Sequence, residues 1–475
     1  MATITFFQNI KAEFPGVQYV SAVLKKHGHN CNMVIDTQPA GFVKALKKNI
    51  PDVIGFSLMS GMQHWALNVC REVKKEFPDI KVVFGGVHPT YFPEVIEEEG
   101  VDIICRGEGE YAMLDLMNAL DNNSDIANIL NLWVKQKDRI YKNDLRHLIE
   151  NLDELPFMDL ELYYDNYPFL KNLSVKNFLG VRGCPYDCSF CFNHKLKEMY
   201  RGKGKYTRFR SKENIIEEIL QVKSRYDFKR VFFISDIMFI NKRWALDFLR
   251  YYREKINLPY IGLIRADMLD EELVRELKTS GCCIARFGME SGNEKLRNEI
   301  LKKNLSDDQI IKTAGLLTKY GIKFRAYCMT GLPGETVEQA FETIDLNIRI
   351  KTAYPWCSVY NPYSGTKIVD YAKEEGFLDK DFDINSIDDS YYKGSVMKNN
   401  NINELLNIQR FFQTAVLFPW TLPLIKKLVK LPPNPLFNLW FQFIYFLVYI
   451  KSEGLRVQEV LSFSLHYMKV FYKKK

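Results

Sequence analysis

Three cysteines, Cys184, Cys188 and Cys191, stand in one short loop at C-x3-C-x2-C spacing, and they are the side chains best suited to chemistry. Three thiolates can bind three corners of a four-iron cluster, and no fourth cysteine lies near them in the sequence. One iron would then stay open to bind another molecule. A zinc site with His194 as the fourth ligand is the alternative, although structural zinc sites normally take their ligands in pairs. The spacing favours the cluster.

The cysteine loop follows the first of six predicted strands, which span residues 178–182, 230–235, 260–265, 284–289, 323–330 and 356–360. Predicted helices separate these strands, over residues 213–226, 243–254, 270–279, 307–320 and 337–350. The alternation predicts a partial α/β barrel or another parallel sheet. Ligands of such folds bind at the carboxyl ends of the strands, where the cysteine loop is expected to lie.

The first 120 residues show a second alternation of strands and helices. Strands are predicted at residues 4–7, 32–36, 52–57, 81–84 and 101–105, and helices at 17–26, 62–77 and 109–120. This pattern predicts a doubly wound parallel sheet. Ser57 ends one buried strand, and Gly85 and Gly86 follow the next, where glycine lets the backbone approach a flat macrocycle or a nucleotide tail.

We divide the chain into a Rossmann-like domain (1–125), a linker (126–171), a partial barrel (172–376) and a mainly helical, aromatic-rich C-terminal region (377–475). In the last region, residues 436–450 form an apolar run that is shorter than the ~20 residues needed to span a bilayer. We expect a buried helix that covers the barrel. An interfacial helix or the wall of a lipid pocket is the alternative, because lysines flank the run.

Composition narrows the classes of protein that remain. The 475 residues are 47% hydrophobic and 26% charged, as in ordinary globular proteins. The N-terminus lacks the pattern of a signal peptide, which predicts a cytoplasmic protein with reduced thiols. The net charge of +7 is mild, and no basic stripe interleaved with aromatic residues indicates nucleic-acid binding.

The cysteine loop and the strand-end motifs together resemble the radical S-adenosylmethionine (SAM) superfamily. The matching residues are Phe190 before the last cysteine, Asp236 after the second strand, Arg265 after the third, Glu290 and Ser291 after the fourth, and Gly331 and Gly334 after the fifth. The resemblance implies that these residues contact SAM, which would bind the open iron. It also implies cleavage of SAM to a 5′-deoxyadenosyl radical, with an electron from an external donor such as flavodoxin or ferredoxin.

Residues 16–29, 84–90 and 106–110 resemble the cobalamin-binding domain that is fused to one radical SAM subclass. The resemblance implies that Ser57, Gly85 and Gly86 contact cobalamin. The Asp-x-His-x-x-Gly signature, whose histidine ligates cobalt in other cobalamin proteins, is absent. Either cobalamin binds without a histidine ligand or the domain has lost it, and His88 is interpreted as a loop residue.

The two resemblances together imply an enzyme that methylates an unactivated carbon or phosphorus of a small substrate. An anaerobic oxidative cyclase, or a rearrangement of a carbon skeleton without methyl transfer, is the alternative reaction. A non-catalytic cobalamin or iron–sulfur sensor is the alternative of another class. The apolar C-terminal region points to a lipid or macrocyclic substrate and to peripheral membrane contact, and the open cluster to an anaerobic setting.

Overall fold

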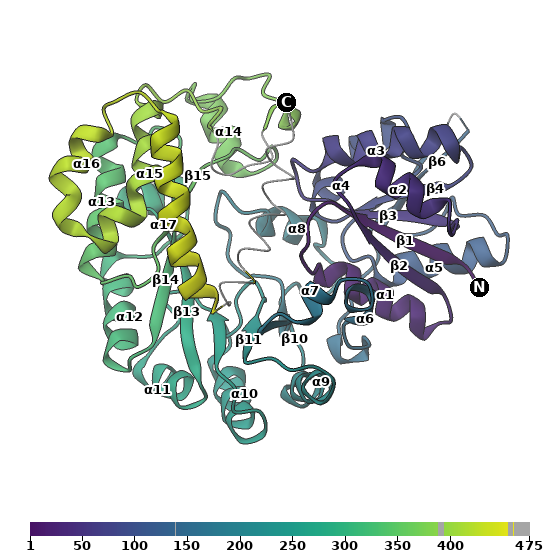
Figure 1. The fold of residues 1–475 in the computed structure, drawn as a ribbon, viewed down its shortest axis with the longest axis horizontal. Helices are drawn as coiled ribbons and strands as arrows, with labels where there is room; N and C mark the ends of the chain where they lie inside the picture. Colours follow the sequence, from purple (N-terminus) through teal and green to yellow (C-terminus); the bar gives the residue numbers. More distant parts are fainter. Residues whose placement is uncertain (138, 388–393, 455–458, 460–475) are drawn as a thin grey trace. The chain divides into compact units, whose positions relative to one another are not determined.

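A computed structural model describes residues 1–137, 139–387, 394–454 and 459 of the chain. These residues form two compact units (Figure 1). The first contains Met1–Leu173 and the short segment Met199–Lys205, and the second contains Ser174–Glu198 and residues 206–454. Each unit has its own sheet and its own core.

The first unit is a doubly wound sheet of strand order β2-β1-β3-β4-β5-β6-β7. Its first five strands are parallel: β1 (Thr3–Gln8), β2 (Asn30–Ile35), β3 (Val53–Ser57), β4 (Lys81–Gly85) and β5 (Ile103–Cys105). Four helices connect them, α1 (Pro15–Lys26), α2 (Pro39–Leu46), α3 (Gln63–Glu76) and α4 (Val87–Tyr91), and α5 (Glu110–Asp121) follows β5. Helix α1 packs beside α5 and α2 beside α3, and β3 and β4 are almost wholly apolar, as strands covered on both faces require.

Two features of this unit differ from the prediction. Helix α2 was not expected, because its eight residues are few and include a glycine, but Phe42 and Leu46 anchor it in the core. Residues 126–171, expected to be an irregular linker, contain two further strands, β6 (Leu132–Gln136) and β7 (Arg139–Lys142). Strand β6 pairs antiparallel with β5 and extends the sheet, and its short amphipathic run gave no clear sequence signal.

The end of the expected linker also packs on the first unit. Tyr163 of helix α6 (Glu161–Tyr164) is completely buried, and the Tyr163 hydroxyl donates to the Gln8 side-chain oxygen over 2.9 Å. The Asp159 carboxylate accepts from the Ser21 hydroxyl of α1 over 2.5 Å and pairs with Lys25 over 2.7 Å. Long-range side-chain contacts of this kind have no periodic signature in the sequence.

The second unit contains the predicted six-stranded parallel sheet, in the order β15-β14-β13-β12-β11-β8. The strands are β8 (Val175–Phe178), β11 (Arg230–Phe233), β12 (Tyr260–Leu263), β13 (Cys282–Glu290), β14 (Lys323–Thr330) and β15 (Trp356–Val359). Each strand pairs with the next parallel strand along the chain, as in a partial barrel. The predicted α/β fold with a partial barrel is confirmed.

The helices between these strands match the predicted ranges to within one or two residues. They are α9 (Lys212–Arg225), α10 (Lys242–Lys255), α11 (Glu271–Thr279), α12 (Asp307–Lys319) and α13 (Val337–Arg349). Each is preceded by a Ser, Asn, Asp or Thr whose side-chain oxygen accepts from a backbone N–H of the first turn. Such N-caps make the helix starts readable from sequence.

The first strand of the barrel was misplaced. Strand β8 ends at Phe178, and Val181–Arg182 form a separate strand, β9, that pairs with β10 (Arg208–Phe209). The Ser235 hydroxyl accepts from the backbone N–H groups of Gly180 and Val181, over 3.1 and 2.9 Å, and so holds the chain in a turn. The turn shifts the cysteine loop several residues further from the strand than expected.

Helix α14 (Lys367–Glu374) follows the last strand, and the described part of the C-terminal region is helical, with α15 (Ile402–Leu417), α16 (Leu422–Leu428) and α17 (Pro435–Glu453) (Figure 1). Ile444 and Val448 of α17 pack on Ile261 of β12 and Ile284 of β13. These residues lie on the sheet face opposite to that of Tyr260, which packs on α10.

Helix α17 corrects the expectation of a buried apolar helix, since only one of its faces is buried. The helix extends over 19 residues, and Leu436 and Phe443 are exposed to 73% and 55%. None of the described helices is both long and apolar enough to cross a membrane.

Candidate active site

The cysteine loop is held at the carboxyl end of the second unit's sheet by its own backbone. Cys188 is buried, while Cys184 and Cys191 are partly exposed. The N–H of Cys191 donates to the carbonyl of Cys188 over 3.1 Å, which closes the turn between them. Gly183, with φ of 84°, begins the loop, and a Cβ there would lie 2.3 Å from the carbonyl oxygen of Tyr206. Only glycine fits this approach of two backbone segments.

Asp236 and Asn193 support the loop from two sides. Asp236 accepts from the N–H of Gly183 and from the Asn193 side chain, both over 3.1 Å. Asn193 directs its backbone N–H and its amide toward the sulfur of Cys191, each at 3.5 Å. Tyr206 fixes the Asn193 amide by donating to its oxygen over 2.6 Å. Donors aimed at a sulfur stabilise a thiolate ligand.

Arg265 connects the cysteine loop with the segment that follows β13. Its guanidinium is buried, lies 4.0 Å from the sulfur of Cys188 and stacks on the ring of Tyr186 at 3.8 Å. It also pairs with Asp267 over 2.8 Å and donates to the carbonyl oxygens of residues 303 and 304. Arg265 thus places a buried cation beside one of the three predicted cluster ligands.

Glu290 and Lys303 form a buried ion pair of 2.9 Å near the same sheet edge. The φ of Glu290 is 68°, a left-handed conformation that costs a non-glycine residue about 1–3 kcal/mol. The side chain folds back over Gly288, where a Cβ would lie 1.9 Å from its carboxylate oxygen and 3.0 Å from the Lys303 nitrogen. Lys303 also lies 5.8 Å from the ring centre of Phe190. Strain of this kind is typical of functional sites.

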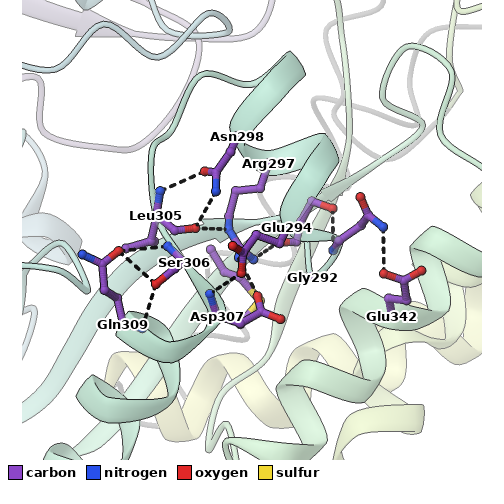
Figure 2. A network of polar contacts seen from close by, with 12 residues as sticks. Gly292, Glu294, Arg297, Asn298, Leu305, Ser306, Asp307, Gln309 and Glu342 are labelled. Carbon is purple, nitrogen blue, oxygen red and sulfur yellow. Dashed lines mark hydrogen bonds and ion pairs between the residues drawn. The ribbon is translucent and has the colours of Figure 1, made fainter.

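Arg297 fastens the turn that follows Glu290 (Figure 2). The side chain is completely buried and donates to the carbonyl of Leu305 over 2.7 Å, to that of Ser291 over 2.8 Å and to the Asp307 carboxylate over 2.5 Å. Figure 2 shows how Asn298 adds two further contacts to the backbone of Leu305. The network fixes the two segments from which Glu290 and Lys303 project.

Glu335 organises the loop after β14. One of its carboxylate oxygens accepts from the N–H groups of Gly331 and Leu332, over 2.6 and 3.2 Å, and from the Thr330 hydroxyl over 3.3 Å. Its other oxygen is buried without a partner among the described residues. Burial raises the pKa of this carboxyl to about 7, although the backbone donors oppose the shift. Gly331 and Gly334 have φ of 80° and 73°, which glycine adopts without strain.

The structure brings the predicted residues of this site to one edge of the sheet, but not all of them present a free side chain. Phe190 is partly buried against Leu296 and Leu301. Ser291 is fully buried, and its hydroxyl accepts from the N–H of Asn293 over 3.2 Å, so it holds the turn. Whether the predicted residues contact SAM stays a prediction.

Sequence reasoning missed Lys303, Arg297 and Asn193. Lys303 and Arg297 lie after the motif of the fourth strand, in a segment with no recognisable pattern. Asn193 stands two residues after Cys191, and its position beside the motif is the only signal that could have pointed to it.

The thiols fit a four-iron cluster better than a zinc ion. His194 directs its Nδ1 to the carbonyl of Cys191 at 2.5 Å. Among the described residues, no three or more His, Cys, Asp or Glu side chains are placed to hold one metal ion. A cluster requires a wider spacing, because each thiolate binds a different iron. Burial raises the pKa of Cys184 to about 11, so binding of iron would displace its proton.

The first unit has a separate candidate site at the carboxyl ends of β3 and β4, where Ser57 and Gly85 are neighbours in the sheet. The next residue, Gly86, has φ of 91°, and a Cβ there would lie 2.8 Å from the backbone nitrogen of Leu58. At Gly85 a Cβ would meet no atom closer than 3.7 Å, so this strand end is uncrowded. The open edge with small residues fits a cofactor that lies across the sheet edge.

His88 does not present its ring as a ligand in this site. The ring is buried, stacks beside Phe92 at 5.1 Å and has its Nδ1 at 3.3 Å from the Ser60 hydroxyl. Burial lowers the pKa of His88 to about 4. The residues at this strand end therefore fit cobalamin that is bound without a histidine ligand from this loop, in line with the interpretation of His88 as a loop residue.

Comparison with known proteins bears on both units. The family described as "B12 binding domain" matches residues 12–117, and the "Radical SAM superfamily" matches residues 179–346. An uncharacterised methyltransferase of Pyrococcus horikoshii is 28% identical over 374 residues, which cover 76% of this chain and 79% of that protein. An anaerobic magnesium-protoporphyrin IX monomethyl ester cyclase of Rubrivivax gelatinosus is 26% identical over 351 residues, 69% of this chain and 60% of the cyclase.

A solved structure has the same fold. It is the radical SAM methyltransferase TsrM of Kitasatospora setae with cobalamin and a [4Fe-4S] cluster bound. The TM-score is 0.64 at 16% identity, and the match covers 79% of this chain and 75% of TsrM. The two matched families imply a 4Fe–4S cluster and SAM for the second unit, and cobalamin for the first.

Proposed function

Because this chain is a radical SAM protein with an N-terminal B12-binding domain, we propose that it methylates an unactivated carbon or phosphorus centre of a small substrate. The observation that carries the proposal is the cysteine loop, which lies at the carboxyl edge of the barrel sheet between Asp236, Arg265 and the segment that holds Lys303. The relatedness to a methyltransferase supports the reaction class.

Cys184, Cys188 and Cys191 would hold the cluster, and Ser57, Gly85 and Gly86 would contact cobalamin. When bound, the cluster supplies the electron that cleaves SAM to a 5′-deoxyadenosyl radical, and cobalamin supplies a carrier for the methyl group. An external donor such as flavodoxin or ferredoxin would deliver the electron to the cluster.

The protein's own part would be binding and orientation. Arg265 and Lys303 place two buried cations near the cysteine loop, which suits the carboxylate of SAM. Glu290 offers a carboxylate oxygen to a ribose hydroxyl, and its strained backbone fixes the direction of the side chain. Glu335 holds the loop whose backbone at Gly331 and Gly334 would approach the adenine. Fixed groups of this kind need no rearrangement when the ligand reacts.

The proposed class of substrate rests on helix α17. Helix α17 lies on the face of the barrel sheet that faces away from α10, and it carries many aromatic residues. This supports a lipid-like or macrocyclic small molecule and peripheral contact of a cytoplasmic protein with a membrane. The cyclase relative supports, as the second candidate, a ring-forming or rearranging reaction without methyl transfer.

Product analysis separates these functions. Protein that is reconstituted anaerobically with its cluster and with cobalamin, the proposed methyl acceptor, is incubated with reductant and SAM that carries a labelled methyl group. We expect both 5′-deoxyadenosine and S-adenosylhomocysteine, since SAM that has given up its methyl group becomes S-adenosylhomocysteine. Release of 5′-deoxyadenosine with no S-adenosylhomocysteine would favour the cyclase-type reaction. If neither product forms while the cluster is intact, the sensor alternative is correct.

The ligand assignment is tested with a pair of cysteine variants. Cys188→Ala removes the buried thiol beside Arg265, and we expect it to abolish iron–sulfur absorbance and SAM cleavage. Cys283→Ala is the matched control, because this thiol lies in β13, outside the cysteine loop, and donates to the carbonyl of Tyr260. SAM cleavage that survives in Cys188→Ala would show that the cluster ligands are assigned wrongly.

A further inference from the structure

Helix α17 presents a stripe of large apolar side chains to solvent. The stripe consists of Leu436 (73% exposed), Leu439 (61%), Trp440 (42%), Phe443 (55%) and Leu447 (41%). Their spacing of three, one, three and four residues places them on one face of the helix. Isolated exposed leucines are common on proteins, but five large apolar side chains in one row indicate an interaction surface.

The other faces of α17 fix the helix on its own unit. Ile444 and Val448 pack on the barrel sheet. At the C-terminal end, Glu453 pairs with Arg286 over 2.7 Å and with Arg325 over 2.9 Å. Trp440 donates its ring N–H to the Thr414 hydroxyl over 2.9 Å, so its polar atom is satisfied inside the protein. The exposed stripe therefore belongs to a docked helix with a defined outward face.

A second apolar group lies at the start of α16. Trp420 is exposed to 80% and Leu424 to 58%. The charges that accompany α16 and α17 at the surface are all positive, since Lys426, Lys427 and Lys451 are exposed. The only carboxylate between residues 405 and 454 is that of Glu453, which is held in the ion pairs with the two arginines.

The distribution of charge along the chain also shows that positive charge is concentrated near α16 and α17. Residues 405–475 contain ten Lys and Arg against two Glu, a net charge of +8. Since the whole chain carries +7, the preceding 404 residues carry −1. The net positive charge of the protein thus comes entirely from the part of the sequence that contains the apolar stripe.

From these observations we propose that α17, with the α16 end, is a docking surface for an anionic lipid bilayer. The stripe of α17 inserts among the headgroups while the lysines contact lipid phosphates, as in helices that lie in the plane of a membrane. The exposed tryptophan rings suit the boundary between headgroups and acyl chains. A twofold contact with a second copy is less suited, because it would bring two surfaces of the same positive charge together.

The proposal is tested by flotation of the full-length, cluster-reconstituted protein with vesicles. One set contains phosphatidylcholine with 30% phosphatidylglycerol, and the other contains phosphatidylcholine alone. We expect binding to the anionic vesicles that weakens with added salt, and at least tenfold weaker binding to the neutral ones, because each lysine near an anionic surface contributes about a factor of five. This readout is independent of SAM cleavage, so it can fail while the proposed enzyme function holds.

Two variants locate the surface. Leu439→Gln with Phe443→Gln removes the centre of the stripe, and Lys426→Gln with Lys427→Gln removes two charges. Each should lower anionic-vesicle binding about tenfold or more, with an unchanged far-UV circular dichroism spectrum and thermal midpoint. The matched control is Leu220→Gln on α9, an exposed leucine (42%) remote from the stripe in the sequence.

Three results would overturn the proposal. The first is a wild-type protein that does not bind anionic vesicles. The second is binding that the α16 and α17 variants leave unchanged, or that the Leu220→Gln control lowers equally. The third is a lipid-independent dimer in light scattering that the Leu439→Gln and Phe443→Gln changes dissociate, which would assign the stripe to a second copy of the chain.

Discussion

Replacement of Arg297 by lysine tests whether the turn after β13 is held by one buried guanidinium. The three nitrogens of Arg297 reach three different acceptors, the carbonyls of Ser291 and Leu305 and the Asp307 carboxylate (Figure 2). Lysine keeps the charge, but its single nitrogen cannot reach all three. The Leu305 carbonyl would keep its bond from Asn298 and the Asp307 carboxylate is partly exposed, so the fully buried acceptor that depends on Arg297 is the Ser291 carbonyl.

The magnitude follows from that loss. A buried acceptor that is left without its donor costs about 1–3 kcal/mol. One such loss destabilises the turn by about 2 kcal/mol, which raises the local opening constant by about thirtyfold. Because Glu290 and Lys303 project from the same two segments, we also expect SAM affinity to fall while the cluster absorbance is retained.

Hydrogen–deuterium exchange measures this effect where it arises. Peptides that cover residues 290–307 should lose protection in Arg297→Lys. The control is Arg275→Lys on α11, where the exposed side chain should give no change. Unchanged protection in Arg297→Lys, or an equal loss in the control, would refute the reasoning. Exchange that rises over the whole second unit would mean that Arg297 supports the core and not the turn.

Three further changes test other parts of the structure. Glu453→Gln leaves two buried arginines without their carboxylate. The local stability of α17 should therefore fall by about 3–5 kcal/mol, which hydrogen–deuterium exchange would show as lost protection of its amides. Glu374→Gln is the exposed control. The pKa of Glu335 is about 7 in the folded protein, against 4.5 for a carboxyl in the unfolded chain. Between these two pH values, the native carboxyl keeps a proton that the unfolded chain releases. Stability should therefore fall by about 3 kcal/mol as the pH rises from 4.5 to 7, and urea denaturation of Glu335→Gln should lack this fall. Gly86→Ala should cost about 2 kcal/mol or more in thermal unfolding, because a Cβ would lie 2.8 Å from a backbone nitrogen at φ of 91°. Gly16→Ala, with no atom within 4 Å, should be neutral or slightly stabilising.

Local rules in the sequence determined the order of strands and helices in both units. Strand-like and helix-like stretches identified the strands and helices, and in the structure N-caps such as Ser306 and Thr336 lie at the helix starts. The cysteine triple was readable for the same reason, since its three ligands lie within one loop. The strands β6 and β7 were missed because they are short and are stabilised by pairing, β6 with β5 and β7 with β6.

The candidate site depends more on tertiary contacts. Asp236, Arg265 and Glu290 were found because each closes a predicted strand. Lys303 and Arg297 were not found, because their roles arise only when the segment after β13 folds back against the sheet edge. The strained φ of Glu290 also follows from this packing and leaves no mark in the sequence.

The C-terminal helix shows the same division. The sequence by itself determined that residues 436–450 are apolar, helical and too short to span a bilayer with ease. It could not determine which side chains are buried, because apolar residues occur on every face of the helix. Only the tertiary structure decided this, by packing Ile444 and Val448 on the sheet and leaving Leu436 and Phe443 in solvent. Burial depends on the neighbours of a side chain, and the strand residues on which Ile444 and Val448 pack, Ile261 and Ile284, lie more than 150 residues earlier in the chain.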